Sequence, residues 1–153
     1  MEERKHIPVE RMEFFGRYVA VSNWVWSVVG DWSIFARDTV GKQLVRACDS
    51  VGANLVEGDG RYSNMDALHF FVIARASARE ARYWIELAGD RQLMSSETAQ
   101  EKIGELVGAT QLLNQFIKFR RSNVKSNRVK EQLAAYDFDA NPDDVFTEPL
   151  FEF

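Results

Sequence analysis

The sequence predicts an all-α protein folded as an up-down-up-down antiparallel four-helix bundle. Apolar residues recur at helical steps of three and four over four segments, each about 20 residues long. Short polar breaks separate the segments, so consecutive helices must lie antiparallel. No strand-like alternation of apolar and polar residues competes with this pattern. The 153 residues, 46% of them hydrophobic, suffice for one domain with a real core.

The first helix is expected over about residues 9–29, with Pro8 near its first turn. It carries two apolar stripes instead of one. They are Met12, Phe15, Val19, Ser22, Trp26 and Val29, and Phe14, Tyr18, Val21, Val25 and Val28. A lone amphipathic helix needs only one stripe. The second stripe therefore predicts burial on two sides, inside the bundle or between subunits.

The second helix is expected over about residues 38–57, with Asp38 as its N-cap. Its apolar stripe is Val40, Leu44, Cys48, Val51 and Leu55. Gly52 costs this helix about 1 kcal/mol relative to alanine, so we expect close packing or a bend there. Gly58 is expected to end the helix in the left-handed conformation.

The third helix is expected over about residues 64–88, because Ser63 and Asp66 have the spacing of a capping box. It too has apolar residues on more than one side. The fourth helix is expected over about residues 97–130, where seven residues form a seam. They are Ala99, Ile103, Leu106, Thr110, Leu113, Ile117 and Val124. Residues 1–130 thus form the bundle, and residues 131–153 form a separate tail.

The stretch "SVGANLVEGDGRYS" places an amide and a carboxylate where the second helix meets a turn. Glu57 is expected beside the start of the third helix, where a carboxylate accepts unpaired backbone N–H groups. Asn54, one turn deeper, is expected to bridge to Asp66 or His69. The preferred interpretation is a structural clamp on the hairpin, and a catalytic or ligand-binding role is the alternative.

Arg75 lies too far along the hairpin to reach Glu57 in the same chain, so we expect it to pair with Asp49 or Glu80. The charged and amide residues of the two helices then form one structural polar network that fixes the geometry of the hairpin and of the subunits. Its members are Arg46, Asn54, Glu57, Arg75 and Glu80.

The segments "GKQLVRACDSVGANLVEGDGRYS" and "ALHFFVIARASAREARYWIELA" resemble the four-helix-bundle family named after the 23S rRNA intervening-sequence protein. The similarity covers roughly residues 9–122, although many members have proline where this chain has Gly52. It implies a compact bundle that assembles as a homopentamer, with no established enzymatic activity. A related branch serves reverse transcriptases of retroelements as an accessory protein and binds nucleic acid through a basic surface.

Catalytic and metal chemistry find little support in the residues. A di-iron bundle needs Glu-x-x-His on two helices, but the chain has two histidines and His6 lies in the N-terminal arm. Cys48 falls in an apolar stripe without a nearby histidine, which indicates an inert core thiol. We therefore expect no enzyme, cofactor or metal site. The single cysteine and the absence of an 18-residue apolar run favour a cytoplasmic protein.

The net charge of −4 hides two segments of opposite sign. Residues 131–153 contain seven of the 23 acidic residues and no Lys or Arg. Just before them lies a basic segment that is suited to RNA or DNA phosphates. It holds Lys118, Arg120, Arg121, Lys125, Arg128 and Lys130. The alternative is a solvated helix end, where positive charge also suits the helix dipole.

The tail "YDFDANPDDVFTEPLFEF" mixes acids with four phenylalanines. One hypothesis is that it docks into an apolar groove on a neighbouring subunit or a partner protein, and the alternative is a disordered tail. Taken together, the sequence predicts a non-enzymatic, homo-oligomeric scaffold or adaptor, most plainly a pentamer. The second interpretation is a nucleic-acid-binding accessory protein that uses residues 118–130.

Overall fold

The structure is a computed structural model that describes residues 6–122 of the chain. Within this range the protein is all-α, as predicted, and has no strand. Four long helices are α1 (Glu13–Gly30), α3 (Lys42–Asp59), α4 (Asn64–Asp90) and α5 (Ser96–Ser122). Three short elements are the 3-10 helix η1 (Val9–Arg11), α2 (Ile34–Ala36) and the π-helical turn η2 (Arg37–Gly41).

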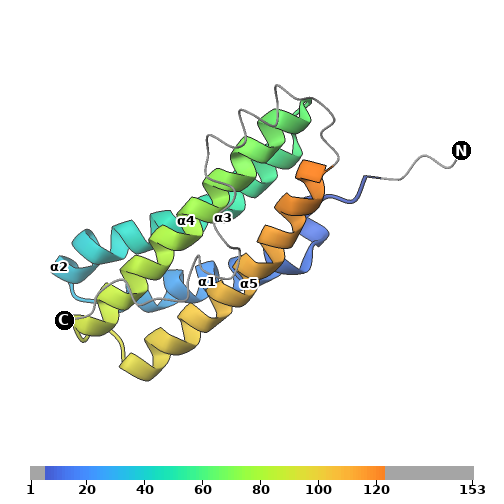
Figure 1. Ribbon diagram of the computed structural model, residues 1–153. Coiled ribbons are helices and arrows are strands. Elements are labelled where there is room, and N and C mark those ends of the chain that lie inside the picture. Colours follow the sequence, from blue (N-terminus) through green and yellow to red (C-terminus); the bar gives the residue numbers. More distant parts are fainter. Residues whose placement is uncertain (1–5, 123–153) are drawn as a thin grey trace, which may run out of the picture.

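The long helices pack in a closed ring. The helix α1 packs on α3, α3 on α4 and α4 on α5, and α5 returns to α1. Figure 1 shows α3 and α4 side by side as a hairpin, with α1 and α5 packed alongside it. The arrangement is therefore a four-helix bundle, as the apolar spacing predicts. No helix within residues 6–122 is both long and apolar enough to cross a membrane.

The start of α4 follows its predicted cap, because Ser63 Oγ accepts hydrogen bonds from the backbone N–H groups of Met65 and Asp66. The start of the second helix does not. Helical turns run without a break from Ile34 into α3, and the cap is Ser33, whose Oγ accepts from the Ala36 N–H at 3.3 Å. The predicted cap Asp38 is wrong, since Asp38 lies inside a π-helical turn and contacts Lys42 at 3.2 Å.

Gly58 does not adopt the predicted left-handed conformation. No glycine within residues 6–122 has a positive φ, and α3 continues past Gly58 to Asp59. The glycine serves close packing instead. A Cβ at this position would lie 2.7 Å from Cε1 of Phe71 and 3.0 Å from the carbonyl oxygen of Ala67. The helix α4 therefore approaches α3 too closely here for any side chain.

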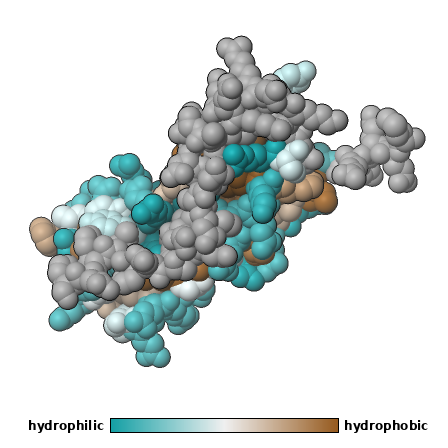
Figure 2. All heavy atoms as spheres, viewed as in Figure 1, coloured by the Kyte–Doolittle hydropathy of each residue, from teal (hydrophilic) through white to brown (hydrophobic). Residues whose placement is uncertain are grey.

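Gly52 is less constrained than predicted, because a Cβ there would meet only Phe15, at an ordinary contact distance of 3.9 Å. The two apolar stripes of α1 also differ. One is buried in the core, whereas on the other Val19 is 37% and Trp26 71% exposed. Apolar patches interrupt the hydrophilic surface in Figure 2. A single chain thus covers the first stripe but leaves part of the second exposed, since Val29 of the second stripe is buried and Val19 and Trp26 are not.

Candidate functional site

The α3–α4 interface contains a small network of polar side chains. Asn54 Nδ2 donates to the carbonyl oxygen of Ser50 at 2.8 Å and to Ser50 Oγ at 3.0 Å. Ser50 Oγ in turn shares a 3.0 Å hydrogen bond with Ser77 Oγ across the interface. The predicted bridge from Asn54 to Asp66 or His69 is therefore wrong, because the amide is satisfied within its own helix and reaches α4 only through a serine pair.

Glu57 does not accept the N–H groups at the start of α4. Its carboxylate pairs with Arg61 one turn later, and Ser63 already caps α4. Both side chains of this pair are about half exposed, so the pair adds little to stability. The guanidinium of Arg61 also lies over the ring of Phe70, 4.5 Å from its centre. Glu57 thus orients an arginine at the turn of the hairpin.

A second polar cluster lies in the bundle where α1, α4 and α5 meet. Arg75 Nη1 donates to Asn114 Oδ1 at 3.3 Å, and Asn114 is 6% exposed. Tyr18 Oη forms a 2.8 Å hydrogen bond with Thr110 Oγ1, which donates to the carbonyl oxygen of Leu106. Burial raises the pKa of Tyr18 strongly, against the opposing effects of its bond to Thr110 and of the nearby charge of Arg75.

Sequence reasoning missed this cluster because Tyr18 and Thr110 fall in apolar stripes and read as ordinary core. The predicted partners of Arg75 are engaged elsewhere. Asp49 accepts a hydrogen bond from Ser22 on α1, and Glu80 accepts one from Trp84 on its own helix. The five predicted network residues therefore do not form one network. Asn54 and Arg75 belong to separate clusters, Glu57 pairs with Arg61 in the turn after α3, and Glu80 contacts Trp84 within α4.

Cys48 is 3% exposed, and burial raises the pKa of its thiol to about 12. Such a thiol is protonated at neutral pH, and its burial in the core agrees with its place in the predicted apolar stripe. His6 contacts Asp59 at 3.0 Å. Over the described range, no three His, Cys, Asp or Glu side chains cluster as metal ligands.

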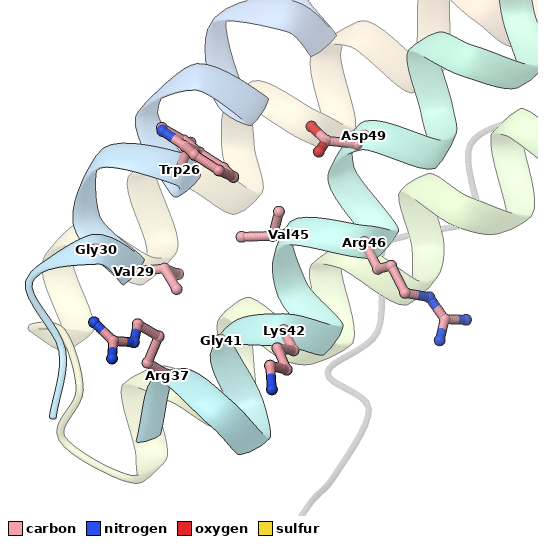
Figure 3. A pocket seen from close by; sticks show the side chains of 9 residues that line it. All are labelled: Trp26, Val29, Gly30, Arg37, Gly41, Lys42, Val45, Arg46 and Asp49. Carbon is pink, nitrogen blue, oxygen red and sulfur yellow. The ribbon is translucent and has the colours of Figure 1, made fainter. Parts of the chain in front are cut away.

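An apolar groove, which we call the α1–α3 groove, opens between the last turns of α1 and the start of α3. It has a volume of about 460 Å³ and is lined by Trp26, Val29, Gly30, Arg37, Gly41, Lys42, Val45, Arg46 and Asp49. Figure 3 shows Val29 and Val45 facing the gap between the two helices. Arg37 and Lys42 lie at one end of the gap, Asp49 lies at the other, and the side chain of Arg46 points away from the gap.

The opposite end of the bundle is basic and aromatic. Arg120 Nη2 donates to Asn64 Oδ1 at 3.3 Å, which brings the end of α5 next to the start of α4. This basic end comprises Arg61, Tyr62, Lys118, Phe119, Arg120 and Arg121. Tyr62 is fully exposed, and Phe119 is 56% exposed. The other predicted phosphate contacts, Lys125, Arg128 and Lys130, and the tail of residues 131–153 lie outside the described residues.

Comparisons with known proteins agree with this architecture. The family model described as 23S rRNA-intervening sequence protein matches residues 10–115. Among solved structures, a protein of unknown function from the S23 ribosomal protein family of Bacteroides thetaiotaomicron shares the fold with a TM-score of 0.61 and 22% identity. The alignment covers 69% of this chain and 98% of that one. No curated protein matches the chain.

Proposed function

The chain belongs to the 23S rRNA-intervening sequence protein family, and on that premise we propose that it is a non-enzymatic scaffold or adaptor that assembles as a homopentamer. The observation that carries the proposal is an apolar corner on α2, where Ile34 is 70% and Phe35 79% exposed. Two large apolar neighbours this exposed are typical of a surface that another protein covers. We propose that further copies of this chain cover the surface.

Three features support this function over an enzyme. The polar clusters lie between helices and are satisfied there, as structural groups are. The single thiol is buried and protonated. Val19, on the second stripe of α1, also stays 37% exposed in one chain, which fits a face reserved for assembly. A cytoplasmic location is part of the proposal.

The test is the mass of the assembly in a Phe35→Glu variant. Burying a large apolar side chain contributes about 2 kcal/mol per copy, and a buried unpaired carboxylate costs more. We expect Phe35→Glu to separate the assembly into monomers at micromolar concentration in native mass spectrometry. Ile7→Glu is the matched control, since Ile7 is 57% exposed but lies outside the long helices. An unchanged assembly in Phe35→Glu contradicts the assignment of α2 to the interface.

Nucleic-acid binding is the second candidate function, and the basic end of the bundle favours it. Exposed aromatic rings beside cations suit single-stranded RNA or DNA, whose bases stack on rings while phosphates meet the charges. Not every cation is equally available, because Arg61 pairs with Glu57 and Arg120 lies 5.7 Å from the ring centre of Phe71. Lys118 is exposed and is the first residue to test.

The measurement is the affinity of the full chain for a short single-stranded RNA at two salt concentrations. Lys118→Glu should weaken binding and reduce its salt dependence, because each phosphate contact releases counterions. Arg91→Glu, which reverses an exposed cation at the opposite end of the bundle, is the control. Equal binding by both variants would exclude the basic end as the contact surface.

A further inference from the structure

We propose that the acidic, aromatic segment of residues 143–153 binds in the α1–α3 groove of its own chain. The groove offers an apolar floor with cations beside it. Its volume of about 460 Å³ lies within the range of clefts that take compact ligands, which leaves room for one or two large side chains. Trp26 forms one wall and is 71% exposed in the absence of an occupant.

The charges around the groove select an acidic occupant. Two cations, Arg37 and Lys42, lie at one end of the groove, and the lining carboxylate, Asp49, lies at the other. A third lining cation, Arg46, points its guanidinium away from the gap. Lys42 is partly neutralised by Asp38, which lies 3.2 Å away. Asp49 accepts a hydrogen bond from Ser22 and so faces α1. The side of the groove next to η2 is therefore positive.

Residues 143–153 match both properties of the groove. The segment "DDVFTEPLFEF" alternates acidic residues with valine, leucine and phenylalanine and contains no Lys or Arg. An apolar side chain such as that of Phe146 or Phe151 fits the floor of Val29 and Val45, while neighbouring carboxylates meet Arg37 and Lys42. Hydrophobic contact supplies the affinity, and the charges fix the orientation of the segment.

The chain is long enough to make this contact within one molecule. Ser122 ends α5 near Asn64, at the start of α4. The Ser50–Ser77 contact places Val45 level with the region of Arg82, about 27 Å along α4 from Asn64 at the helical rise. Residues 123–142 span about 66 Å when extended, which is enough to cover the distance of about 27 Å along α4 and also to pass around the bundle to the groove. A tethered segment also has a high effective concentration at its own groove.

The test uses the full chain with a photoreactive phenylalanine analogue, benzoylphenylalanine, in place of Phe151. After irradiation, mass spectrometry locates the crosslinked peptide. We expect crosslinks to residues that line the α1–α3 groove, such as Trp26 or Val45. A mixture of isotopically heavy and light chains distinguishes contacts within one chain, which we predict, from contacts between copies.

A charge-reversal pair tests the electrostatic part of the proposal. At low ionic strength, where exposed charges are least screened, Arg37→Glu combined with Lys42→Glu should lower the crosslink yield about threefold, whereas Arg11→Glu combined with Arg79→Glu should leave it unchanged. Both pairs reverse two exposed cations. Crosslinks between heavy and light chains, crosslinks outside the groove, the absence of any crosslink, or equal effects of the two pairs would each overturn the proposal.

Discussion

Replacing Gly58 by alanine should destabilise the protein, although alanine is the better helix former. The new Cβ would lie 2.7 and 2.9 Å from two ring carbons of Phe71, whereas carbon atoms in contact prefer about 3.5–4.0 Å. The ring would have to move by about 1 Å to restore that distance. Phe71 is fully buried, and its ring centre lies 5.2 Å from that of Phe116. The ring therefore cannot shift without displacing other core side chains.

The size of the effect follows from two opposing contributions. Overpacking of a rigid core costs about 1–3 kcal/mol, and the change from glycine to alanine in a helix returns up to about 1 kcal/mol. Gly58→Ala should therefore lower the free energy of unfolding by up to about 2 kcal/mol. Gly104→Ala is the matched control, because Gly104 lies inside α5 with no atom within 4 Å of its added Cβ. It should raise the free energy of unfolding by about 1 kcal/mol.

Chemical unfolding, followed by far-ultraviolet circular dichroism, measures the free energy of unfolding of both variants. All samples must have the same chain concentration, because assembly couples stability to concentration. The two variants should unfold at clearly different denaturant concentrations, on opposite sides of the unmodified protein. A Gly58→Ala variant as stable as Gly104→Ala would refute the close approach of α3 and α4 at this turn.

Three further predictions concern buried groups. Tyr18→Phe should lower the free energy of unfolding by about 1 kcal/mol at neutral pH in the same assay, because it removes the hydrogen bond to Thr110. The pKa of Tyr18 is raised in the folded protein, so the free energy of unfolding should fall as the pH rises above the ordinary tyrosine value of 10.0. This loss of stability at high pH should be smaller in Tyr18→Phe, and equal losses in the two proteins would contradict the prediction. Cys48 should resist a thiol reagent at pH 8 until the protein is unfolded, and rapid labelling of the native protein would show that it is not buried.

The course of the helices could be predicted from the sequence because apolar periodicity reports burial directly. Ser63 caps α4 as its spacing predicts. The start of the second helix could not be predicted in the same way. Ile34 and Phe35 are exposed in the chain, so they do not continue the apolar stripe that marks a helix. The residue pattern therefore favours Asp38 as the N-cap. A helix whose first turn faces outward gives no periodic signal of its own.

The polar residues were harder to place, because a side chain of known type still has several neighbours within reach. The sequence predicts that Asn54 and Arg75 make polar contacts between helices, but it does not identify their partners. Their partners depend on rotation of one helix against another, which the sequence does not encode locally. Asn114, the partner of Arg75, lies on a different helix, 39 positions away. Gly58 likewise is predicted to be a special position because it is a glycine near a helix end, but only the close approach of α3 and α4 explains why a side chain does not fit there.

The proposed function requires the bundle to work as an assembly of identical chains. A native mass spectrum of the freshly purified 153-residue chain at low salt tests this most directly. We predict one species of about 88 kDa, the mass of five chains of 17.6 kDa each. A spectrum dominated by the single chain at micromolar concentration would contradict the claim. Additional mass that disappears on nuclease treatment would instead favour the basic end as a nucleic-acid surface.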